Sequence, residues 1–267
     1  MAADDFGGRV VEKYGDTLFA LDQDEEFRLR LLAEVFDPLC RAALSELGVD
    51  ARARCLEVGA GSGSVARWLC DKAPHGDVVA TDLDLSLLDR VPEPRLRRLV
   101  HDVTTDPFPE NSFDVIHARL VLSHLPQRED VMRRMLRWLR PGGFVLIESF
   151  CWFPVESSPH PTYRKVMQRW SSLICGTLGT DSWWSRAQPG SFLGYGYRDV
   201  GANTVTQNLR GGTPLADFWR LTVDMSRDQL IAGGYVLPSD LDEFYALLRD
   251  DTFWDLAPAL VQSWGRK

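Results

Sequence analysis

Short apolar runs alternate with amphipathic segments through the middle of this 267-residue chain. The apolar runs that fit buried strands lie at residues 55–58, 77–81, 96–101, 113–118 and 144–149. Segments with the apolar spacing of helices lie at 64–71, from 85–89 onward, and at 131–139. Strands and helices that alternate in this way build a parallel sheet with helices on both faces. The sequence therefore predicts an α/β fold with a doubly wound, mostly parallel sheet.

The length fits a single domain with one sizeable core, and changes of pattern divide it into four parts. Residues 1–50 are expected to form an N-terminal helical cap, in which a helix runs from Asp24 to Leu47 and stops at Gly48. The other parts are a cofactor-binding core at 51–150, a substrate-side insertion at 151–202, and the C-terminal part of the sheet and its helices at 203–267. The expected elements of that last part are strands at 203–209 and 257–264 and helices at 215–231 and 239–248.

Charge, hydropathy and cysteine content narrow the expected partners and the expected location of the protein. The formal net charge is −8 at pH 7, which argues against binding to a nucleic-acid backbone. No segment reaches the roughly 18 uninterrupted apolar residues of a membrane span, so no membrane partner is expected. The five cysteines form no Cys-x-x-Cys pair, and the first residues lack the pattern of a secretory signal. Reduced thiols and a cytoplasmic location follow as expectations.

A glycine-rich loop, Glu57-Val-Gly-Ala-Gly-Ser-Gly, follows the first expected strand. In an open parallel sheet, a ligand lies beyond the carboxyl ends of the strands, where the first strand turns into its helix. Gly59 and Gly61, on either side of Ala60, let the backbone approach a ligand closely because they carry no Cβ. The loop departs from the dinucleotide pattern at Ser64, and it lacks the lysine of a phosphate-binding loop.

Acidic residues follow the second and third expected strands. Asp82, just before Leu83, stands about where a ribose partner is expected, and a carboxylate can accept hydrogen bonds from both ribose hydroxyls. Its alternative role is to cap the segment that follows. Asp102 is placed to accept a hydrogen bond from an adenine amino group, with the backbone of Val103 against the ring. Together with the glycine loop, these acids predict a nucleoside site at three successive strand ends.

With these motifs the sequence resembles the class I S-adenosylmethionine-dependent methyltransferases. The segments that carry the resemblance are residues 56–63, 78–82, 101–103, 113–126 and 139–148, with a weaker match at 259–265. The resemblance implies a seven-stranded sheet whose last strand is antiparallel. It implies S-adenosylmethionine as cofactor and S-adenosylhomocysteine as product. It also implies that Ala118 and Arg119 face the methionine part of the cofactor, and that Glu57 organises the amino end of that part.

A sulfonium is already a strong methyl donor, so the protein mainly has to hold a nucleophile in line and exclude water. A phenol or amine acceptor also needs a base, and Glu148 at the end of the fifth strand is the first candidate. Tyr14 is expected to close over the cofactor from the N-terminal cap. His117 and His124 fit packing or loop-fixing roles better than catalytic ones. No metal is expected, because the fourth strand ends without acidic residues and the histidines lack paired spacing.

The expected insertion is dense in aromatic residues, and nine tryptophans are many for a chain of this length. Some of these side chains are expected to be core residues. The residues that are expected to line an apolar acceptor pocket are Phe150, Trp152, Phe153, Trp170, Trp183 and Trp184. Such a pocket fits a flat aromatic or heteroaromatic acceptor such as a phenol or an indole.

The leading hypothesis is a small-molecule methyltransferase of specialised metabolism that acts on an oxygen, nitrogen or carbon of such an acceptor. A quinone or lipid methyltransferase is an alternative, although no basic amphipathic helix supports membrane association. An NAD-dependent oxidoreductase is disfavoured by Ser64 and by the lack of a Tyr-x-x-x-Lys pair. A module that binds the cofactor without catalysis is a third class. The expected partner is a small-molecule acceptor, and a homodimer is left open.

Overall fold

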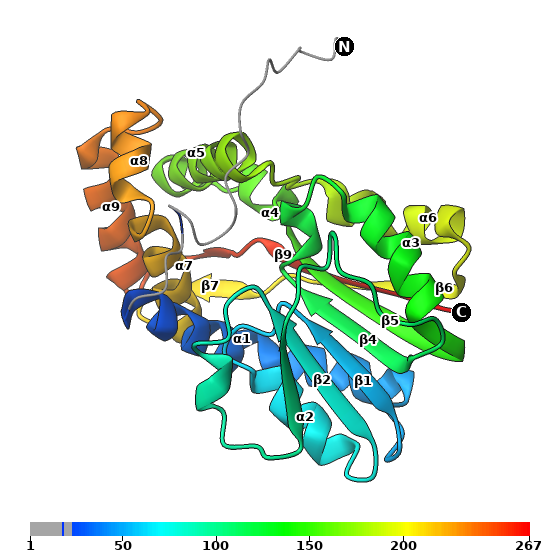
Figure 1. Ribbon diagram of the computed structural model, residues 1–267. Helices are drawn as coiled ribbons and strands as arrows, with labels where there is room; N and C mark the ends of the chain where they lie inside the picture. The colour runs from blue at the N-terminus through cyan, green and yellow to red at the C-terminus, as the bar shows by residue number, and fades with distance from the viewer. Residues whose placement is uncertain (1–17, 19–22) are drawn as a thin grey trace.

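The computed structural model describes residue 18 and residues 23–267 of the chain. Its centre is a seven-stranded sheet with the strand order β3-β2-β1-β4-β5-β9-β6 (Figure 1). The strands of this sheet are β1 (Arg54–Val58), β2 (Asp77–Asp82), β3 (Leu96–Val100), β4 (Phe113–Arg119), β5 (Leu139–Cys151), β6 (Arg198–Val205) and β9 (Ala259–Arg266). Neighbouring strands from β3 to β5 are parallel, and β9 runs antiparallel to both β5 and β6. The predicted doubly wound sheet with an antiparallel last strand is confirmed.

Helices cover both faces of the sheet. One face packs against α1 (Gln23–Leu47) and α2 (Ser64–Lys72), with buried residues such as Leu44 and Leu69. The other face packs against α3 (Arg128–Trp138) and α6 (Trp184–Tyr195). Because both faces are covered, most side chains of the central strands are apolar on both sides, which is why the strands read as nearly continuous apolar runs.

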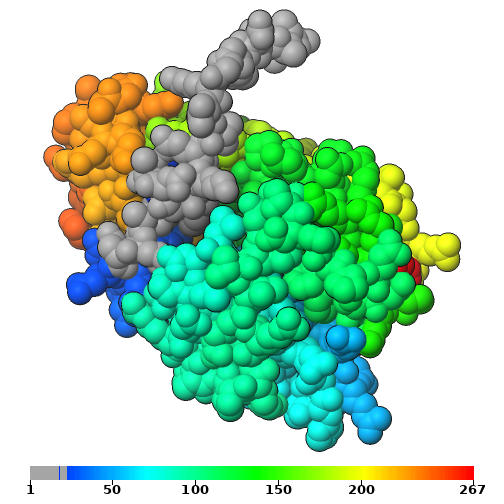
Figure 2. Space-filling model, viewed as in Figure 1, coloured from blue at the N-terminus to red at the C-terminus, as the bar shows by residue number. Residues whose placement is uncertain are grey.

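The remaining helices build a cap beyond the carboxyl ends of the strands. They are α4 (Phe153–Glu156), α5 (Pro161–Leu178), α7 (Pro214–Asp224), α8 (Arg227–Ala232) and α9 (Pro238–Arg249). A small antiparallel sheet of β7 (Asn208–Arg210) and β8 (Trp254–Leu256) joins them. Figure 2 shows α8 and α9, in orange, as a lobe at one end of the molecule, apart from the cyan and green surface of the sheet domain. None of the helices in the described part has the length and apolar composition of a membrane-crossing helix.

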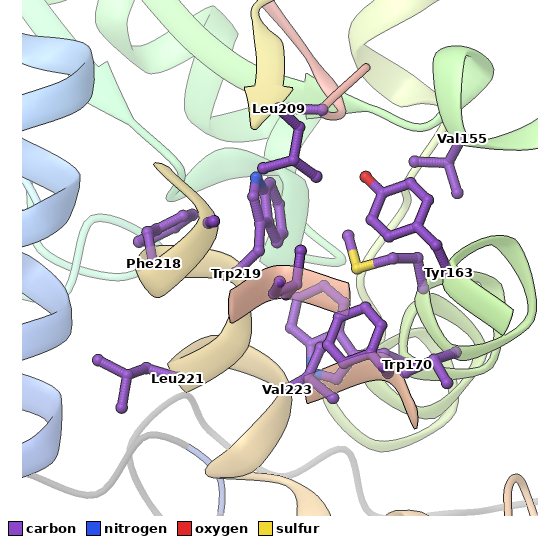
Figure 3. Packing of buried hydrophobic residues seen from close by; sticks show 14 of the residues in the cluster. Val155, Tyr163, Trp170, Leu209, Phe218, Trp219, Leu221 and Val223 are labelled. Atoms are coloured by element: carbon purple, nitrogen blue, oxygen red, sulfur yellow. The ribbon is translucent and has the colours of Figure 1, made fainter. Parts of the chain in front are cut away.

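The aromatic residues of the cap form one buried cluster. Trp219 of α7 is fully buried, and Figure 3 shows it in the cluster with Trp170. The centre of its ring lies 5.1 Å from that of Phe150, 5.5 Å from that of Trp152 and 6.2 Å from that of Trp170. Aromatic pairs at such separations and tilted angles are favourable beyond the area that they bury. The cluster therefore fixes α5 and α7 against the end of β5.

Several predicted elements differ from the structure, and the single helix predicted at 215–231 is divided into α7 and α8. A second α-helix does not begin at residues 85–89, where the chain has only one short 3-10 turn, η1 (Leu88–Arg90). Pro92 and Pro94 follow at once, and proline both removes an N–H donor and disfavours a helical residue before it. The strand predicted at 203–209 is divided between β6 and β7, which belong to different sheets. By contrast, α1 ends as predicted, because Gly48 has a φ of +90° and its N–H bonds to the carbonyl oxygen of Leu44.

Candidate functional site

The strand order reverses direction between β1 and β4. From β1 the chain proceeds outward through β2 to β3, whereas β4 and β5 lie on the other side. Connections that leave a sheet in opposite directions open a crevice at the carboxyl ends of the two central strands. The glycine loop after β1 lies at this crevice, as the sequence predicts.

The glycines of the loop share a left-handed backbone conformation but differ in the space around them. Gly59, Gly61 and Gly63 all have positive φ angles, of +64°, +51° and +72°. A Cβ on Gly59 would lie 2.3 Å from Cγ2 of Val121, which leaves no space for a side chain. Among the described residues, a Cβ on Gly61 would have only one heavy atom near it, Cδ1 of Leu29 at 4.0 Å. These residues thus leave space beside Gly61, where a ligand could approach the backbone.

Asp82 at the end of β2 is tied to this loop. Its Oδ2 accepts a hydrogen bond from the N–H of Gly61 at 2.8 Å, and its Oδ1 accepts one from the N–H of Leu83 at 2.7 Å. Burial raises the pKa of the Asp82 carboxyl, although the hydrogen bonds from Gly61 and Leu83 act in the opposite direction. The Leu83 side chain is exposed. Asp82 is thus a partly buried acceptor at the mouth of the loop.

Asp102 and Val103 follow the neighbouring strand β3. Oδ1 of Asp102 accepts hydrogen bonds from the N–H of Thr104 at 2.9 Å and from its hydroxyl at 2.5 Å. The Val103 side chain is buried and packs on the α3 side of the sheet. The N–H of His101 bonds to the carbonyl oxygen of Asp82 at 3.0 Å, so the two acids lie on adjoining strand ends. Their adenine and ribose roles stay predictions.

Ala118 and Arg119, which are expected to face the methionine part of the cofactor, lie at the end of β4. Ala118 is fully buried in the sheet. Arg119, at the end of β4, donates through Nη2 to Oδ1 of Asp37 on α1 at 2.9 Å, and its Nη1 is buried without a partner among the described residues. Oδ1 of Asp37 also lies 3.2 Å from the hydroxyl of Ser64, the first residue of α2. Arg119 and Asp37 therefore join α1 to the strand end beside the glycine loop.

Glu57 and Glu148 both contact His117 in the interior of the sheet. Nδ1 of His117 lies 2.8 Å from Oε2 of Glu57, and Nε2 lies 2.9 Å from Oε2 of Glu148. Oε1 of Glu148 accepts a hydrogen bond from Gln262 at 2.6 Å. Burial raises the pKa of Glu148, but the hydrogen bond and charge of His117, with the charge of Arg119, bring it below its ordinary value.

Glu148 is fully buried. A proton could reach its carboxylate only if this network opened, so the geometry does not favour Glu148 as a general base and that role stays a prediction. The sequence reasoning set His117 aside as a packing residue, although it is the contact between the two glutamates. A signal for this contact was present in the sequence, because Glu57, His117 and Glu148 each lie within a mostly apolar strand.

The other predicted catalytic residues are placed as follows. Tyr14 lies outside the described residues. His124, in the 3-10 turn η2 (Leu122–His124) after β4, places Nδ1 2.8 Å from the hydroxyl oxygen of Thr180. Burial, with the charges of Arg28 and Arg128, lowers the pKa of His124 to about 4, so its imidazole is neutral at pH 7. Its contact with Thr180 fits the loop-fixing role.

Among the described residues, one group has the donor atoms of a cation site. Cys40 of α1, His117 and Glu148 each place one such atom within 4.8 Å of the others, and all three are buried. However, Nε2 of His117 stands at hydrogen-bond distance from Glu148, and burial raises the pKa of the Cys40 thiol to about 11. Hydrogen-bond contacts of His117 with Glu148 and Cys40 account for the closeness of the three side chains.

The six aromatic residues predicted to line an acceptor pocket do not converge on one place. Phe150, Trp152 and Trp170 meet in the cluster around Trp219. Trp184 belongs instead to the packing between the sheet and α6. Phe153 and Trp183 are exposed by 41% and 42%. Trp219 was not among the predicted site residues, because its place in the cluster depends on the tertiary fold.

A groove of about 640 Å³ lies along α4 and α5. Trp152 and Trp183 line part of it, together with charged residues such as Arg164 and Lys165. Its walls are therefore mixed rather than apolar. No contact among the described residues connects this groove with the glycine loop, so it does not identify the acceptor pocket.

Comparisons with known proteins agree with this geometry. Residues 56–147 match a family model described as "Methyltransferase domain". The chain is 40% identical over 101 residues to "Methyltransferase str2" of Strobilurus tenacellus, covering 37% of this chain and 36% of that protein. It is 35% identical over 134 residues to the ubiquinone/menaquinone biosynthesis C-methyltransferase UbiE of Ectopseudomonas mendocina, covering 46% of this chain and 50% of that protein.

A solved structure extends the similarity beyond the matched segment. It is phosphoethanolamine N-methyltransferase 2 of Haemonchus contortus, with a TM-score of 0.59 and 17% identity over 92% of this chain and 57% of that one. At this identity the likeness is one of fold. The chain spans between about a third and a half of the length of the two curated relatives.

Proposed function

This chain contains a class I methyltransferase domain, and we propose that it transfers the methyl group of S-adenosylmethionine to a small aromatic acceptor. The observation that carries the proposal is the loop between β1 and α2. Its backbone is open above Gly61 and is bonded to the carboxylate of Asp82, with Asp102 on the next strand end. An open backbone beside acidic acceptors suits a nucleoside whose hydroxyl and amino groups donate hydrogen bonds.

The cofactor would lie with its ribose at Asp82 and its adenine near Asp102 and Val103. Its methionine part would lie toward Glu57, Ala118 and Arg119. A solved relative by fold was crystallised with S-adenosylhomocysteine, which supports this assignment. The cofactor supplies a sulfonium methyl group, and the chain holds the acceptor in line with it and excludes water.

The acceptor is proposed to be a phenol- or indole-like metabolite of specialised metabolism, methylated at oxygen, nitrogen or carbon. Support comes from the aromatic side chains that meet where β5 joins the cap, above all Phe150 near the end of β5 with Trp152 and Trp219. Small-molecule sites are lined mainly by apolar and aromatic residues with a few polar groups. Tyr14 is proposed to close over the site from the N-terminal segment.

A quinone is the second candidate acceptor. The observation in its favour is the 35% identity over 134 residues to a ubiquinone/menaquinone biosynthesis C-methyltransferase. That identity covers 46% of this chain.

The reaction is proposed to occur in the cytoplasm. All five cysteines are free in the structure, and four of them are buried. Free thiols without disulfides suit a reducing compartment.

Calorimetry tests the cofactor before any acceptor is known. We expect the protein to bind S-adenosylhomocysteine and to give no heat with NADH. Binding of NADH without S-adenosylhomocysteine would overturn the proposal in favour of an oxidoreductase.

Methyl transfer is then measured with S-adenosylmethionine that is radiolabelled in its methyl group. Phenols, indoles and quinols serve as acceptors, and label in the phenol or indole products is the expected result. Label only in the quinols would select the second candidate. Tight cofactor binding without transfer to any of them would favour a non-catalytic module.

A further inference from the structure

Four neighbouring strands carry a row of buried polar side chains on the face that packs against α1. They are Glu57 on β1, His117 on β4, Glu148 on β5 and Gln262 on β9, and none is more than 3% exposed. Glu57 lies directly beside His117 in the sheet register, and Gln262 lies directly beside Glu148. Side chains that are buried this deeply must be hydrogen bonded to offset the loss of water.

His117 is the centre of the row, because each of its ring nitrogens faces a carboxylate. Nδ1 lies 2.8 Å from Glu57 and Nε2 lies 2.9 Å from Glu148. Ionised carboxylate oxygens only accept hydrogen bonds, so a hydrogen on each ring nitrogen satisfies both contacts. Burial alone would lower the pKa of His117, but the carboxylates of Glu57 and Glu148 beside the ring raise it well above its ordinary value.

The charges of the surrounding side chains balance when His117 is an imidazolium. Arg119 and Arg41 both pair with Asp37 of α1. The acidic members of the group are Asp37, Glu57 and Glu148, and the basic members are Arg41, Arg119 and His117. A buried charge is tolerated when it is paired and hydrogen bonded, and here the acidic and basic side chains are equal in number.

The row ends at the glycine loop. Glu57 stands two residues before Gly59, and its backbone carbonyl accepts a hydrogen bond from the hydroxyl of Thr81 at 3.0 Å. We propose that His117 is a positioning residue whose Nδ1–H fixes the Glu57 carboxylate for the amino group of the bound cofactor. Glu148 and Gln262 hold the ring from the opposite side. This inference rests on the proposed function, because it assumes S-adenosylmethionine in the crevice.

Two substitutions of His117 separate the contact with Glu57 from the contact with Glu148. The amide nitrogen of asparagine is as many bonds from Cα as Nδ1, whereas the amide nitrogen of glutamine matches Nε2. His117→Asn thus keeps a donor toward Glu57, and His117→Gln keeps one toward Glu148. For S-adenosylhomocysteine we expect His117→Gln to weaken binding by about tenfold or more, and His117→Asn by no more than about threefold.

A double-mutant cycle tests whether His117 acts through Glu57. Once Glu57→Gln has been made, adding His117→Gln should cause little further loss of affinity, because residues in one network are not additive. Cys40→Ala is the matched control, since Cys40 touches the His117 ring at 3.4 Å without contacting Glu57, and it should leave affinity unchanged. Urea denaturation of each variant separates loss of binding from loss of folding.

Equal losses in the asparagine and glutamine variants would overturn the proposal, and so would multiplicative effects in the cycle. Nitrogen NMR of the ligand-free protein tests the hydrogen bonds independently of the cofactor: two N–H groups on His117 are expected, and a single one would contradict the proposal. Stoichiometric zinc in the purified protein, bound through Cys40, would also overturn it. A wild-type protein with both N–H groups that binds no S-adenosylhomocysteine would instead overturn the proposed function.

Discussion

The N–H of Gly61 donates a hydrogen bond to Oδ2 of Asp82 at 2.8 Å, which joins the loop after β1 to the end of β2. The sequence suggested two separate roles for Asp82, as a ribose partner and as a cap. The structure shows a third role, because the same carboxylate accepts a hydrogen bond from the glycine loop at the crevice. A substitution of Asp82 should therefore affect both the shape of the loop and its affinity for a nucleoside.

Asp82→Ala is expected to weaken S-adenosylhomocysteine binding by about 1.5 to 3 kcal/mol, the scale of a lost hydrogen bond to a charged group. The matched control is Asp84→Ala, because Asp84 is exposed and its carboxylate bonds to Ser86, outside the glycine loop. Calorimetry of the two variants checks the prediction. Equal affinity of Asp82→Ala and the wild type would remove Asp82 from the site.

Gly61→Ala and Gly48→Ala form a second matched pair. Both glycines have positive φ angles, and a Cβ would meet nothing closer than 4.0 Å in either place. Each substitution should therefore lower the free energy of unfolding by about 1 to 2 kcal/mol through backbone strain alone. Only Gly61→Ala should also lose affinity for S-adenosylhomocysteine, because its methyl group would enter the crevice. The open space is not the cofactor site if the two variants bind equally well.

The pH dependence of stability should report His124. The pKa of His124 is about 4 in the folded protein and near 6.5 when unfolded. As the pH falls below about 6.5, the unfolded chain takes up a proton that the folded chain does not. The free energy of unfolding then decreases by about 1.4 kcal/mol per pH unit until the folded pKa is reached.

His124→Asn removes this titration, so its loss of stability between pH 7 and pH 5 should be about 2 kcal/mol smaller than that of the wild type. Urea denaturation at the two pH values measures the difference. Parallel losses in both proteins would show that His124 has an ordinary pKa.

Trp219→Ala should destabilise the cap strongly. The side chain is fully buried among Phe150, Trp152 and Trp170, and removal of a buried aromatic ring costs about 3 to 5 kcal/mol. Trp254→Ala is the control, because Trp254 is 55% exposed and its replacement should cost less than about 1 kcal/mol. Similar unfolding midpoints for the two variants would show that the aromatic cluster contributes little to stability.

The sheet and the glycine loop could be predicted because their signals are local. The strands at 55–58 and 113–118 are mostly apolar, and the first is followed by the glycines that its tight turn requires. A helix beginning at residues 85–89 was predicted wrongly, since its apolar spacing was weighed without the two prolines that follow.

The sequence by itself determined a parallel sheet, its strand ends and an open glycine backbone between them. Only the tertiary structure decided which polar side chains meet. Glu57, His117 and Glu148 are separated by 60 and 31 residues along the chain, and they touch because strand order and register bring them to one face. Local periodicity predicts that a strand is buried, but not which strand lies beside it or how the two are aligned. The same reason explains why the aromatic residues of the insertion could be recognised but not sorted into core and pocket.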